Sequence, residues 1–396
     1  WLKLAISGSS AGCRAMLWRG ALSTSVHRVG RPQAFTPPRS YHHGRDRGIT
    51  LDTTSRTSRV LGVVGTTSCA NRLQVRRLSS RGSGMETGLV SCEWLKAELD
   101  ASRPLKLVEA TWYLPNSPFA APEGSEGPQA EFMAGPRIPG AGFFDIDGVA
   151  TPHSVPHMLP DEETFAAAMA ALQIEPGTRV VAYDRLGVFS SPRFWYTLKV
   201  AFGHPSDVAV LDGGLPRWKE LGYPLEEGPF DPPAPAKMAV WRKVPEAVWD
   251  KAQVLANCHS GASLHLDARP APRFFGEAPE PRPGMRLGHA PRSLSLPAGS
   301  VLKGPTMLPK DELVKVVQAA GVSLDHLAAP EGPRILTSCG SGLTACVIGL
   351  GLHQIGLPLH RWAVYDGSWA EWGADQETPI LKRGADGGEE VVPPNH

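Results

Sequence analysis

The 396-residue sequence contains no run of about 20 apolar residues, the length that a helix needs to span a bilayer. It has only six cysteines, no two of which form a CxxC pair, and its cysteine and histidine spacings match no zinc site. These absences exclude a membrane-embedded protein, a disulfide scaffold and a zinc module. A reducing compartment is expected, and any thiol chemistry must come from a single cysteine.

Acidic side chains are almost missing from residues 1–84, which carry a formal net charge of +12 against −11 for the rest of the chain. A basic, Ser-rich and acid-poor leader is typical of a mitochondrial transit peptide, and Arg76-Arg77-Leu78-Ser79-Ser80 is similar to a matrix-processing site. The alternative is a basic tail that binds nucleic acid, but no aromatic residues are interleaved with the charges. Translation from Met16 predicts a mitochondrial-matrix protein, and translation from Met85 a cytoplasmic one.

The remaining residues alternate strand and helix patterns, in an order that occurs twice. Segment 210–218 aligns with 364–372, and 180–184 aligns with 335–339, at nearly the same offset. Alternating strands and helices predict an α/β fold with two tandem domains, each a mainly parallel sheet flanked by helices. Helices are expected at 89–100, 161–174, 190–203, 310–321 and 344–356, and strands at 105–115, 143–147, 179–184, 208–214, 264–269 and 334–339, with 362–372 closing the second copy.

Composition also sets the expected boundaries along the chain. The Pro-rich stretch between the two copies has neither helix nor strand signals. The predicted organisation is a basic leader (1–84), a first domain (85–225), a linker (226–240), a second domain (241–376) and a disordered tail (377–396).

One difference between the copies points to chemistry. The central strand ends at Asp184 in the first copy and at Cys339 in the second, and ligands of open α/β sheets bind at the carboxyl ends of strands. Two glycines in the loop 339–344 allow its N–H groups to form an anion nest, and the following helix adds its positive end. Both features favour a thiolate at Cys339. We expect Phe189-Ser190-Ser191-Pro192 in the first copy to be unable to form such a nest.

Two enzyme classes use a cysteine in such a loop. A cysteine phosphatase needs an arginine six residues after the cysteine, to bind phosphoryl oxygens bidentately. Ala345 occupies that position, which argues against phosphoryl transfer. The remaining hypothesis is an enzyme whose thiolate accepts a sulfur atom and holds it as a persulfide.

Five segments carry a family resemblance that covers residues 89–373. They are CGSGLTAC (339–346), DGSWAEW (366–372), RFFGEAPEPRPG (273–284), FFDID (143–147) and HMLP (157–160). Together they resemble the tandem rhodanese-domain sulfurtransferases, and within them the 3-mercaptopyruvate sulfurtransferases. The resemblance implies two rhodanese-like domains and transfer of sulfur from 3-mercaptopyruvate through a persulfide to thiols or cyanide, with release of pyruvate. Reduction of the persulfide by a dithiol such as thioredoxin would form hydrogen sulfide.

The resemblance also implies roles for individual residues. Arg273 and Arg282 would bind the donor carboxylate and keto oxygen, since the planar guanidinium matches a carboxylate; the alternative is that both are solvated loop charges. A relay for the proton would consist of Ser341, His157 and Asp147, with His153 as a competing histidine. The loop residues expected at the substrate are Gly340, Gly342, Leu343 and Thr344. Arg269 is expected to anchor its loop through a salt bridge.

Two rival functions stay open on the sequence. Thiosulfate:cyanide sulfurtransferases have basic residues after the cysteine, whereas Gly340 and Ser341 are neutral and favour an organic donor. A non-catalytic rhodanese-like binding module describes the first copy, which lacks the cysteine. The expected partners are the donor and thiol acceptors; no metal, other cofactor, nucleic acid or membrane is implied. The chain is expected to be a monomer, or a redox-linked dimer through Cys92 or Cys258.

Overall fold

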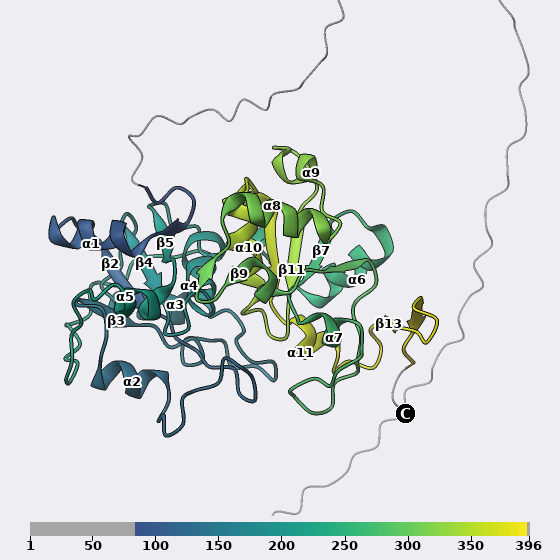
Figure 1. Cartoon of the computed structure of the whole chain (residues 1–396), viewed down its shortest axis with the longest axis horizontal. Helices are drawn as coiled ribbons and strands as arrows, with labels where there is room; N and C mark the ends of the chain where they lie inside the picture. The colour runs from purple at the N-terminus through teal and green to yellow at the C-terminus, as the bar shows by residue number, and fades with distance from the viewer. Residues whose placement is uncertain (1–83, 394–396) are drawn as a thin grey trace, which may run out of the picture. The chain divides into compact units, whose positions relative to one another are not determined.

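The duplicated sequence folds into two five-stranded parallel sheets with the same strand order. The computed structural model describes residues 84–393, so residues 1–83 of the expected leader lie outside the described residues. The first sheet has the order β1-β5-β4-β2-β3 and the second β6-β12-β11-β7-β8. Each strand of one sheet therefore has a counterpart in the other, which confirms the predicted α/β class with two copies of one unit (Figure 1).

The first copy contains five strands and five α-helices. The strands are β1 (Leu89–Val90), β2 (Lys106–Glu109), β3 (Ala141–Phe143), β4 (Val180–Tyr183) and β5 (Val208–Leu211). The helices are α1 (Cys92–Asp100), α2 (Pro128–Ala134), α3 (Glu162–Ala171), α4 (Ser191–Trp195) and α5 (Gly214–Glu220). β2 is shorter than the strand predicted at 105–115. The strand predicted at 143–147 is misplaced, because β3 ends at Phe143 and the chain then turns into a loop.

The second copy repeats this order and adds two small antiparallel hairpins. Its strands are β6 (Val248–Trp249), β7 (Leu264–Asp267), β8 (Ser293–Ser295), β11 (Ile335–Ser338) and β12 (Trp362–Tyr365). Its helices are α6 (Lys251–Ser260), α7 (Ala271–Phe274), α8 (Lys310–Ala319), α9 (Leu324–Ala328), α10 (Ala345–Gln354) and α11 (Ser368–Trp372). The hairpins pair β9 (Leu302–Lys303) with β10 (Thr306–Met307), and β13 (Leu381–Arg383) with β14 (Glu389–Val391).

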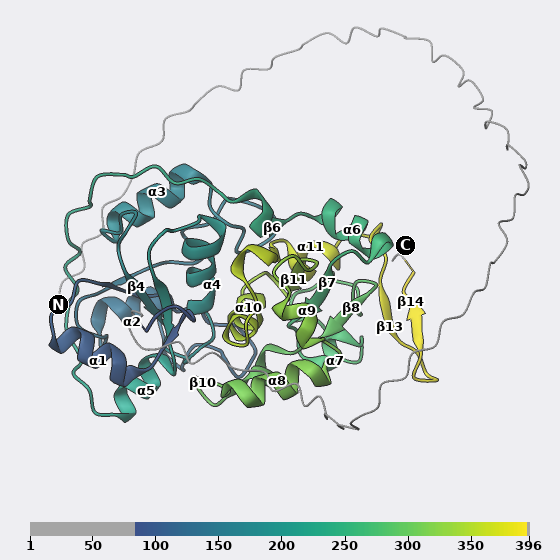
Figure 2. The same cartoon turned by 90° about the horizontal axis from the view of Figure 1, so that it is seen from above.

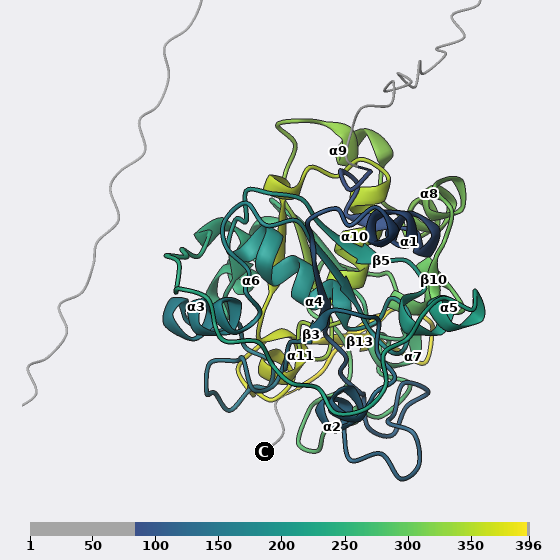
Figure 3. The same ribbon diagram turned by 90° about the vertical axis from the view of Figure 1, so that its left-hand side faces the viewer.

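The central strands are apolar on both faces because helices cover both faces of each sheet. All four residues of β4 are buried. Val180 and Ala182 belong to the cluster that includes side chains of α3 and α4, whereas Val181 and Tyr183 belong to the cluster with α1 and α5 (Figure 3). The alternation of side chains along a strand therefore gives the first sheet its two covered faces.

The predicted helix at 190–203 has two parts. After α4 the chain continues as a π-helix over Tyr196–Ala201. Thr197 Oγ1 donates a hydrogen bond to the carbonyl oxygen of Arg193, 2.8 Å away. This hydroxyl competes for the carbonyl that an α-helical N–H would use, which accounts for the change in helix type.

The prediction of a disordered tail over 377–396 is wrong for the residues that the structure describes, up to 393. β13 and β14 pair there, and Ile380 is fully buried. The hairpin is attached to the second domain because His289 and Leu381 exchange backbone hydrogen bonds of 2.7 and 2.9 Å. Strands of three residues, none of them buried, leave no periodic pattern in the sequence, so composition alone suggested disorder.

The two copies share one apolar core. Helices α4 and α10 lie side by side, one from each copy (Figure 2), and the rings of Trp195 and Trp362 stack with centroids 5.8 Å apart. The chain between the copies, 227–244, forms neither helix nor strand. Within the described range, no helix has the length and apolar character to cross a membrane.

Candidate active site

Cys339 lies where the central strand β11 ends, in the loop that leads into α10. Its side chain is nearly buried. Its N–H donates to Ser368 Oγ at 3.1 Å, and its carbonyl accepts from the N–H of Trp369 at 2.9 Å. The first residues of α11 therefore hold the backbone of the cysteine in place.

The loop after Cys339 offers unused hydrogen-bond donors. Gly342 has a φ of +77°, and a Cβ atom there would lie 3.0 Å from the carbonyl oxygen of Asp366. Glycine is therefore required for the tight turn. No protein acceptor meets the N–H groups of residues 340–344 in the part of the chain that the structure describes. Free N–H groups beside a sulfur atom suit an anionic sulfur species.

The corresponding loop of the first copy shows what this backbone shape binds. Asp184 Oδ2 accepts hydrogen bonds from the N–H groups of Phe189, Ser190 and Ser191 at 3.0, 3.0 and 2.9 Å. The segment has no glycine-rich nest of the kind expected after Cys339, but its N–H groups still converge on one anion. The nest forms without a similar glycine pattern, because the Asp184 carboxylate supplies the anion that draws the N–H groups together.

Arg273 and Arg282 both lie at the cysteine loop. A Cβ atom on Gly340 would lie 3.3 Å from Arg273 Nη2 and 3.8 Å from Arg282 Nη1. The missing side chain of Gly340 thus leaves room for two guanidinium groups. This position gives the predicted substrate arginines access to a ligand at Cys339.

The two arginines differ in their partners. Glu280 is buried and bridges Arg273 to Arg269, whose Nη1 lies 2.8 Å from Glu280 Oε1. Arg269 also pairs with Asp267 at 2.7 Å, which confirms its predicted anchoring role. Among the described residues, Arg282 has no carboxylate within ion-pair distance. Arg273 is therefore fixed in place, whereas Arg282 is available for an anion.

Electrostatics agree with an anion site at Arg282. Burial lowers the pKa of Arg282, and the neighbouring Arg273 adds to this effect. The charges of Cys339 and Asp147 act in the opposite direction. Burial of an unpaired cation costs free energy, and an anionic ligand between the arginines and Cys339 would offset this cost.

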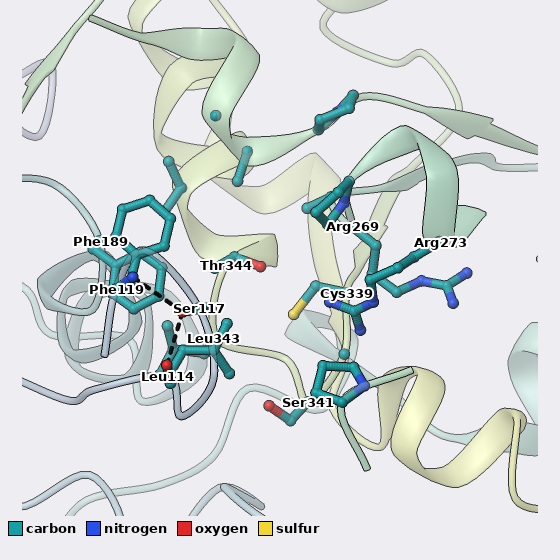
Figure 4. Close-up of a pocket in the computed structure, with 18 of the residues that line it drawn as sticks. Leu114, Ser117, Phe119, Phe189, Arg269, Arg273, Cys339, Ser341, Leu343 and Thr344 are labelled. Atoms are coloured by element: carbon teal, nitrogen blue, oxygen red, sulfur yellow. Dashed lines mark hydrogen bonds between the residues drawn. The ribbon is translucent and has the colours of Figure 1, made fainter. Parts of the chain in front are cut away.

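A cavity of about 570 Å³ contains Cys339, Ser341 and both arginines. Its wall comes from both domains, with Leu114, Phe119 and Phe189 from the first. Figure 4 shows the Cys339 sulfur between Arg273 on one side and these apolar side chains on the other. The site is complete only because the two domains meet.

The predicted Asp147–His157 pair is present in the structure. The backbone N–H of Asp147 donates to Asp145 Oδ1 at 3.0 Å, which fixes the loop after β3. Asp147 Oδ1 lies 2.6 Å from His157 Nδ1, and Asp147 Oδ2 accepts from Trp112 Nε1 at 2.8 Å. Burial acts to raise the pKa of Asp147, but His157 and Trp112 outweigh it and hold that pKa below its usual range.

The third member of the predicted relay is not joined to this pair. Ser341 lines the cavity, but in the described part of the chain no hydrogen bond links it to His157, whose Nε2 is buried without a partner. His153 is exposed, and its Nδ1 accepts from the N–H of Val155 at 3.0 Å. The structure therefore places His157, and not His153, against the predicted carboxylate.

Sequence reasoning missed one residue that organises the site. Arg193 of α4 is buried and donates to the carbonyl oxygens of His157 and Gly342 at 2.6 and 3.2 Å. It also pairs with Asp366. The available signal was weak, because Arg193 is one of two charged residues in the stretch 190–203, with Lys199. Arg193 connects the histidine segment to the cysteine loop.

The remaining thiols and possible ligands suggest no second reactive centre. Burial raises the pKa of Cys92, Cys258 and Cys346 to about 12, 11 and 12, respectively. The cysteines between 84 and 393 form no disulfide. In the same range no group of three or more His, Cys, Asp or Glu side chains is placed to hold a metal ion.

The chain is similar to known sulfurtransferases. The sequence profile of the rhodanese-like domain matches residues 93–221. Thiosulfate/3-mercaptopyruvate sulfurtransferase 1 of Arabidopsis thaliana, named as mitochondrial, is 39% identical over 74% of this chain and 77% of its own. The 3-mercaptopyruvate sulfurtransferase of Escherichia coli K12 is 36% identical over 74% of this chain and 98% of its own.

Solved structures give the same result. The crystal structure of SseA from Escherichia coli, described as a 3-mercaptopyruvate sulfotransferase with a rhodanese fold, matches with a TM-score of 0.60 and 32% identity. It covers 71% of this chain and 98% of its own. The sulfur transferase subunit of yeast mitochondrial complex I matches with a TM-score of 0.64 and 33% identity, over 74% and 99% of the two chains.

Two α/β domains of the rhodanese type, with a cysteine loop in the second, define a tandem rhodanese-domain protein. The identity shared with whole relatives is more specific than the fold. The chain belongs to the 3-mercaptopyruvate sulfurtransferase family and is a sulfur-transferring enzyme.

Proposed function

We propose that this enzyme takes the sulfur of 3-mercaptopyruvate onto Cys339 as a persulfide, releases pyruvate and passes the sulfur to a thiol or to cyanide. The observation that carries the proposal is the arrangement at Cys339. A cysteine flanked by free N–H groups faces two guanidinium groups in one cavity. The N–H groups suit a persulfide anion, and the arginines suit an α-keto acid.

The bonding changes in the donor step balance without an external oxidant or reductant. The Cys339 thiolate attacks the donor sulfur, and the bond between that sulfur and C3 breaks. The electron pair of that bond stays on C3, which leaves as pyruvate enolate, and the proton carried by the transferred sulfur moves to C3. Arg282 and Arg273 hold the carboxylate and the enolate oxygen. Ser341, with His157 oriented by Asp147, is the proposed route for the proton.

Release of the sulfur completes the cycle. An acceptor thiolate or cyanide takes the outer sulfur and regenerates the Cys339 thiolate. With a reducing dithiol such as thioredoxin, the product is hydrogen sulfide. The surfaces of Cys92 and Cys258 are largely covered and their thiols are held protonated, which supports a monomer rather than a dimer linked through them.

Thiosulfate is the second candidate donor. Two Arabidopsis relatives, 39% and 37% identical, are named for both thiosulfate and 3-mercaptopyruvate. Gly340 and Ser341 bring no positive charge to the loop, and this favours the keto acid over a dianion. Measured kcat/KM values for the two donors, with cyanide as the common acceptor, decide between them, and a higher value for thiosulfate would refute our preference.

The direct test of the nucleophile is the intact mass after treatment with 3-mercaptopyruvate. The native protein should gain one sulfur atom, and Cys339→Ser should gain none. Cys258→Ser is the matched control, because it removes another buried thiol outside the cavity and should still gain the sulfur. Sulfur gain by Cys339→Ser would overturn the proposal.

We also propose that the enzyme is present in the mitochondrial matrix and the cytoplasm. The +12 leader and the mitochondrial Arabidopsis relative support the first location, and a start at Met85 would produce the second. Tagged proteins that start at Met16 and at Met85 can be expressed and the cells fractionated. Recovery of the longer form in the cytosol alone would show that the leader does not direct import.

A further inference from the structure

The cavity at Cys339 is larger than the proposed donor requires. Its volume of about 570 Å³ is typical of sites that enclose a drug-sized ligand, whereas 3-mercaptopyruvate is a three-carbon acid. Only one end carries the guanidinium groups of Arg273 and Arg282. The donor, held by its carboxylate, would leave most of the cavity unfilled.

The rest of the cavity has an apolar wall, formed by Leu114, Phe119, Phe189 and Leu343. The rings of Phe119 and Phe189 stack with centroids 4.2 Å apart and an interplanar angle of 13°. In Figure 4 these rings lie on the opposite side of the Cys339 sulfur from Arg273. One face of the sulfur is thus next to cations and the other next to apolar side chains.

Hydrogen bonds hold the loop that presents part of this wall. Ser117 Oγ donates to the carbonyl oxygen of Leu114 at 2.7 Å and accepts from the N–H of Phe119 at 3.0 Å. The N–H of Leu114 donates to the carbonyl oxygen of Phe119 at 2.9 Å. The loop is therefore preorganised, and Leu114 and Phe119 remain partly exposed at the cavity. A fixed apolar surface next to a reactive sulfur suits an organic ligand.

We infer that the apolar wall binds the body of the sulfur acceptor, a small thiol that carries an aromatic or branched aliphatic group. This inference rests on the proposed function, because it requires a persulfide on Cys339. The acceptor thiolate attacks the outer sulfur of the persulfide, and the bond between that sulfur and Cys339 Sγ breaks. A new S–S bond forms on the acceptor, Cys339 leaves as the thiolate, and no oxidant or reductant is consumed.

The test compares two acceptors that differ in apolar area, benzyl mercaptan and 2-mercaptoethanol, with rates expressed per thiolate. Benzyl mercaptan should have a kcat/KM at least about tenfold higher, since a single methylene in an apolar pocket already changes this ratio about tenfold or more. Phe119→Ala should abolish most of this preference, and Phe119→Leu should retain part of it. Sulfur loading from 3-mercaptopyruvate is measured in each variant, so that acceptor rates are compared per loaded Cys339.

Phe230→Ala is the matched control, because Phe230 is also a half-buried loop phenylalanine but packs on Phe132, outside the cavity. It should keep the native preference. Equal rates for the two thiols, or a preference that survives Phe119→Ala, would overturn the inference. If 3-mercaptopyruvate fails to load Cys339, the proposed donor is wrong. Inorganic polysulfide then serves to load the thiol, and the comparison of the two acceptors still tests the inference.

Discussion

Arg193 of the first domain and Asp366 of the second form a buried ion pair, with Nη2 2.6 Å from Oδ1. The other carboxylate oxygen of Asp366 accepts from the N–H of Leu159 at 2.7 Å. Asp212, the counterpart of Asp366 in the first copy, accepts from the N–H of Met307 in the second copy at 2.8 Å. The same aspartate in each copy thus reaches across to the other domain, and only one of these contacts adjoins the cysteine loop.

Removing the carboxylate of Asp366 should destabilise the protein strongly. Asp366→Ala leaves the Arg193 guanidinium buried without its anion, a change that typically costs about 3–5 kcal/mol. Urea unfolding of the native protein and the variant measures this difference. Glu277→Ala is the control, because its pair with Arg383 is exposed on both sides and should contribute less than about 1 kcal/mol. An equal decrease in the free energy of unfolding in the two variants would contradict the role given to the buried pair.

Arg282→Gly should act mainly on donor binding. Loss of a charge-assisted hydrogen bond of about 1.5–3 kcal/mol raises KM for 3-mercaptopyruvate roughly ten- to hundredfold, with little change in kcat. Arg273→Gly should change both constants, because Glu280 fixes Arg273 beside the reacting sulfur. Arg242→Gly removes an exposed arginine outside the cavity and should behave as the native enzyme. Native kinetics in both cavity variants would show that the carboxylate binds elsewhere.

Asp184→Cys should not create a second sulfur-transfer site. The nest of the first copy is present, but a Cβ atom on Gly187 would lie 2.3 Å from the carbonyl oxygen of Pro305, so the loop is covered by the other domain. The neighbouring Arg185 forms an ion pair with Glu109, with Nε 2.6 Å from Oε1, and is therefore not free to bind a donor carboxylate. Intact mass after donor treatment of the double variant with Cys339→Ser measures the outcome. A gain of sulfur there would show that the loop is accessible.

His265 should make the folded protein sensitive to acid. Burial lowers its pKa to about 4; Asp267 opposes this shift, while Arg269 and His289 favour it. The unfolded chain has the higher pKa of about 6.5, so it binds the proton first as the pH falls. Stability should be lost between pH 6.5 and 4, by about 3 kcal/mol in total.

The measurement is urea unfolding at several pH values, with His265→Gln as the comparison. Glutamine cannot titrate and can still bond to Ser338, whose Oγ lies 2.7 Å from His265 Nε2. The difference in the free energy of unfolding between the native protein and His265→Gln should shrink as the pH falls from 6.5 to 4, because only the native protein loses this stability. Parallel stability curves would show that His265 takes up no proton on unfolding.

The sequence by itself determined the architecture and the position of the proposed nucleophile, Cys339. Short apolar, β-branched runs and longer Ala- or Leu-rich segments are local features of the chain, so strands such as β4 and β11 and helices such as α3 and α10 were predictable. The duplication aligned Asp184 with Cys339, so only the second copy has a cysteine at this position, the proposed nucleophile. The resemblance added Asp147 and His157, and their contact confirmed that the two segments meet.

Only the tertiary structure decided how the site is assembled. Arg193 and Asp366 are 173 positions apart, and no local pattern reports a contact between residues so distant in sequence. The nest around Asp184 depends on a carboxylate that collects N–H groups, which a search for glycines does not detect. The hairpin after residue 380 forms because Ile380 is buried in the second domain and Leu381 pairs with His289. In each case the stabilising partner lies in another element, so the physical cause exists only once the chain has folded.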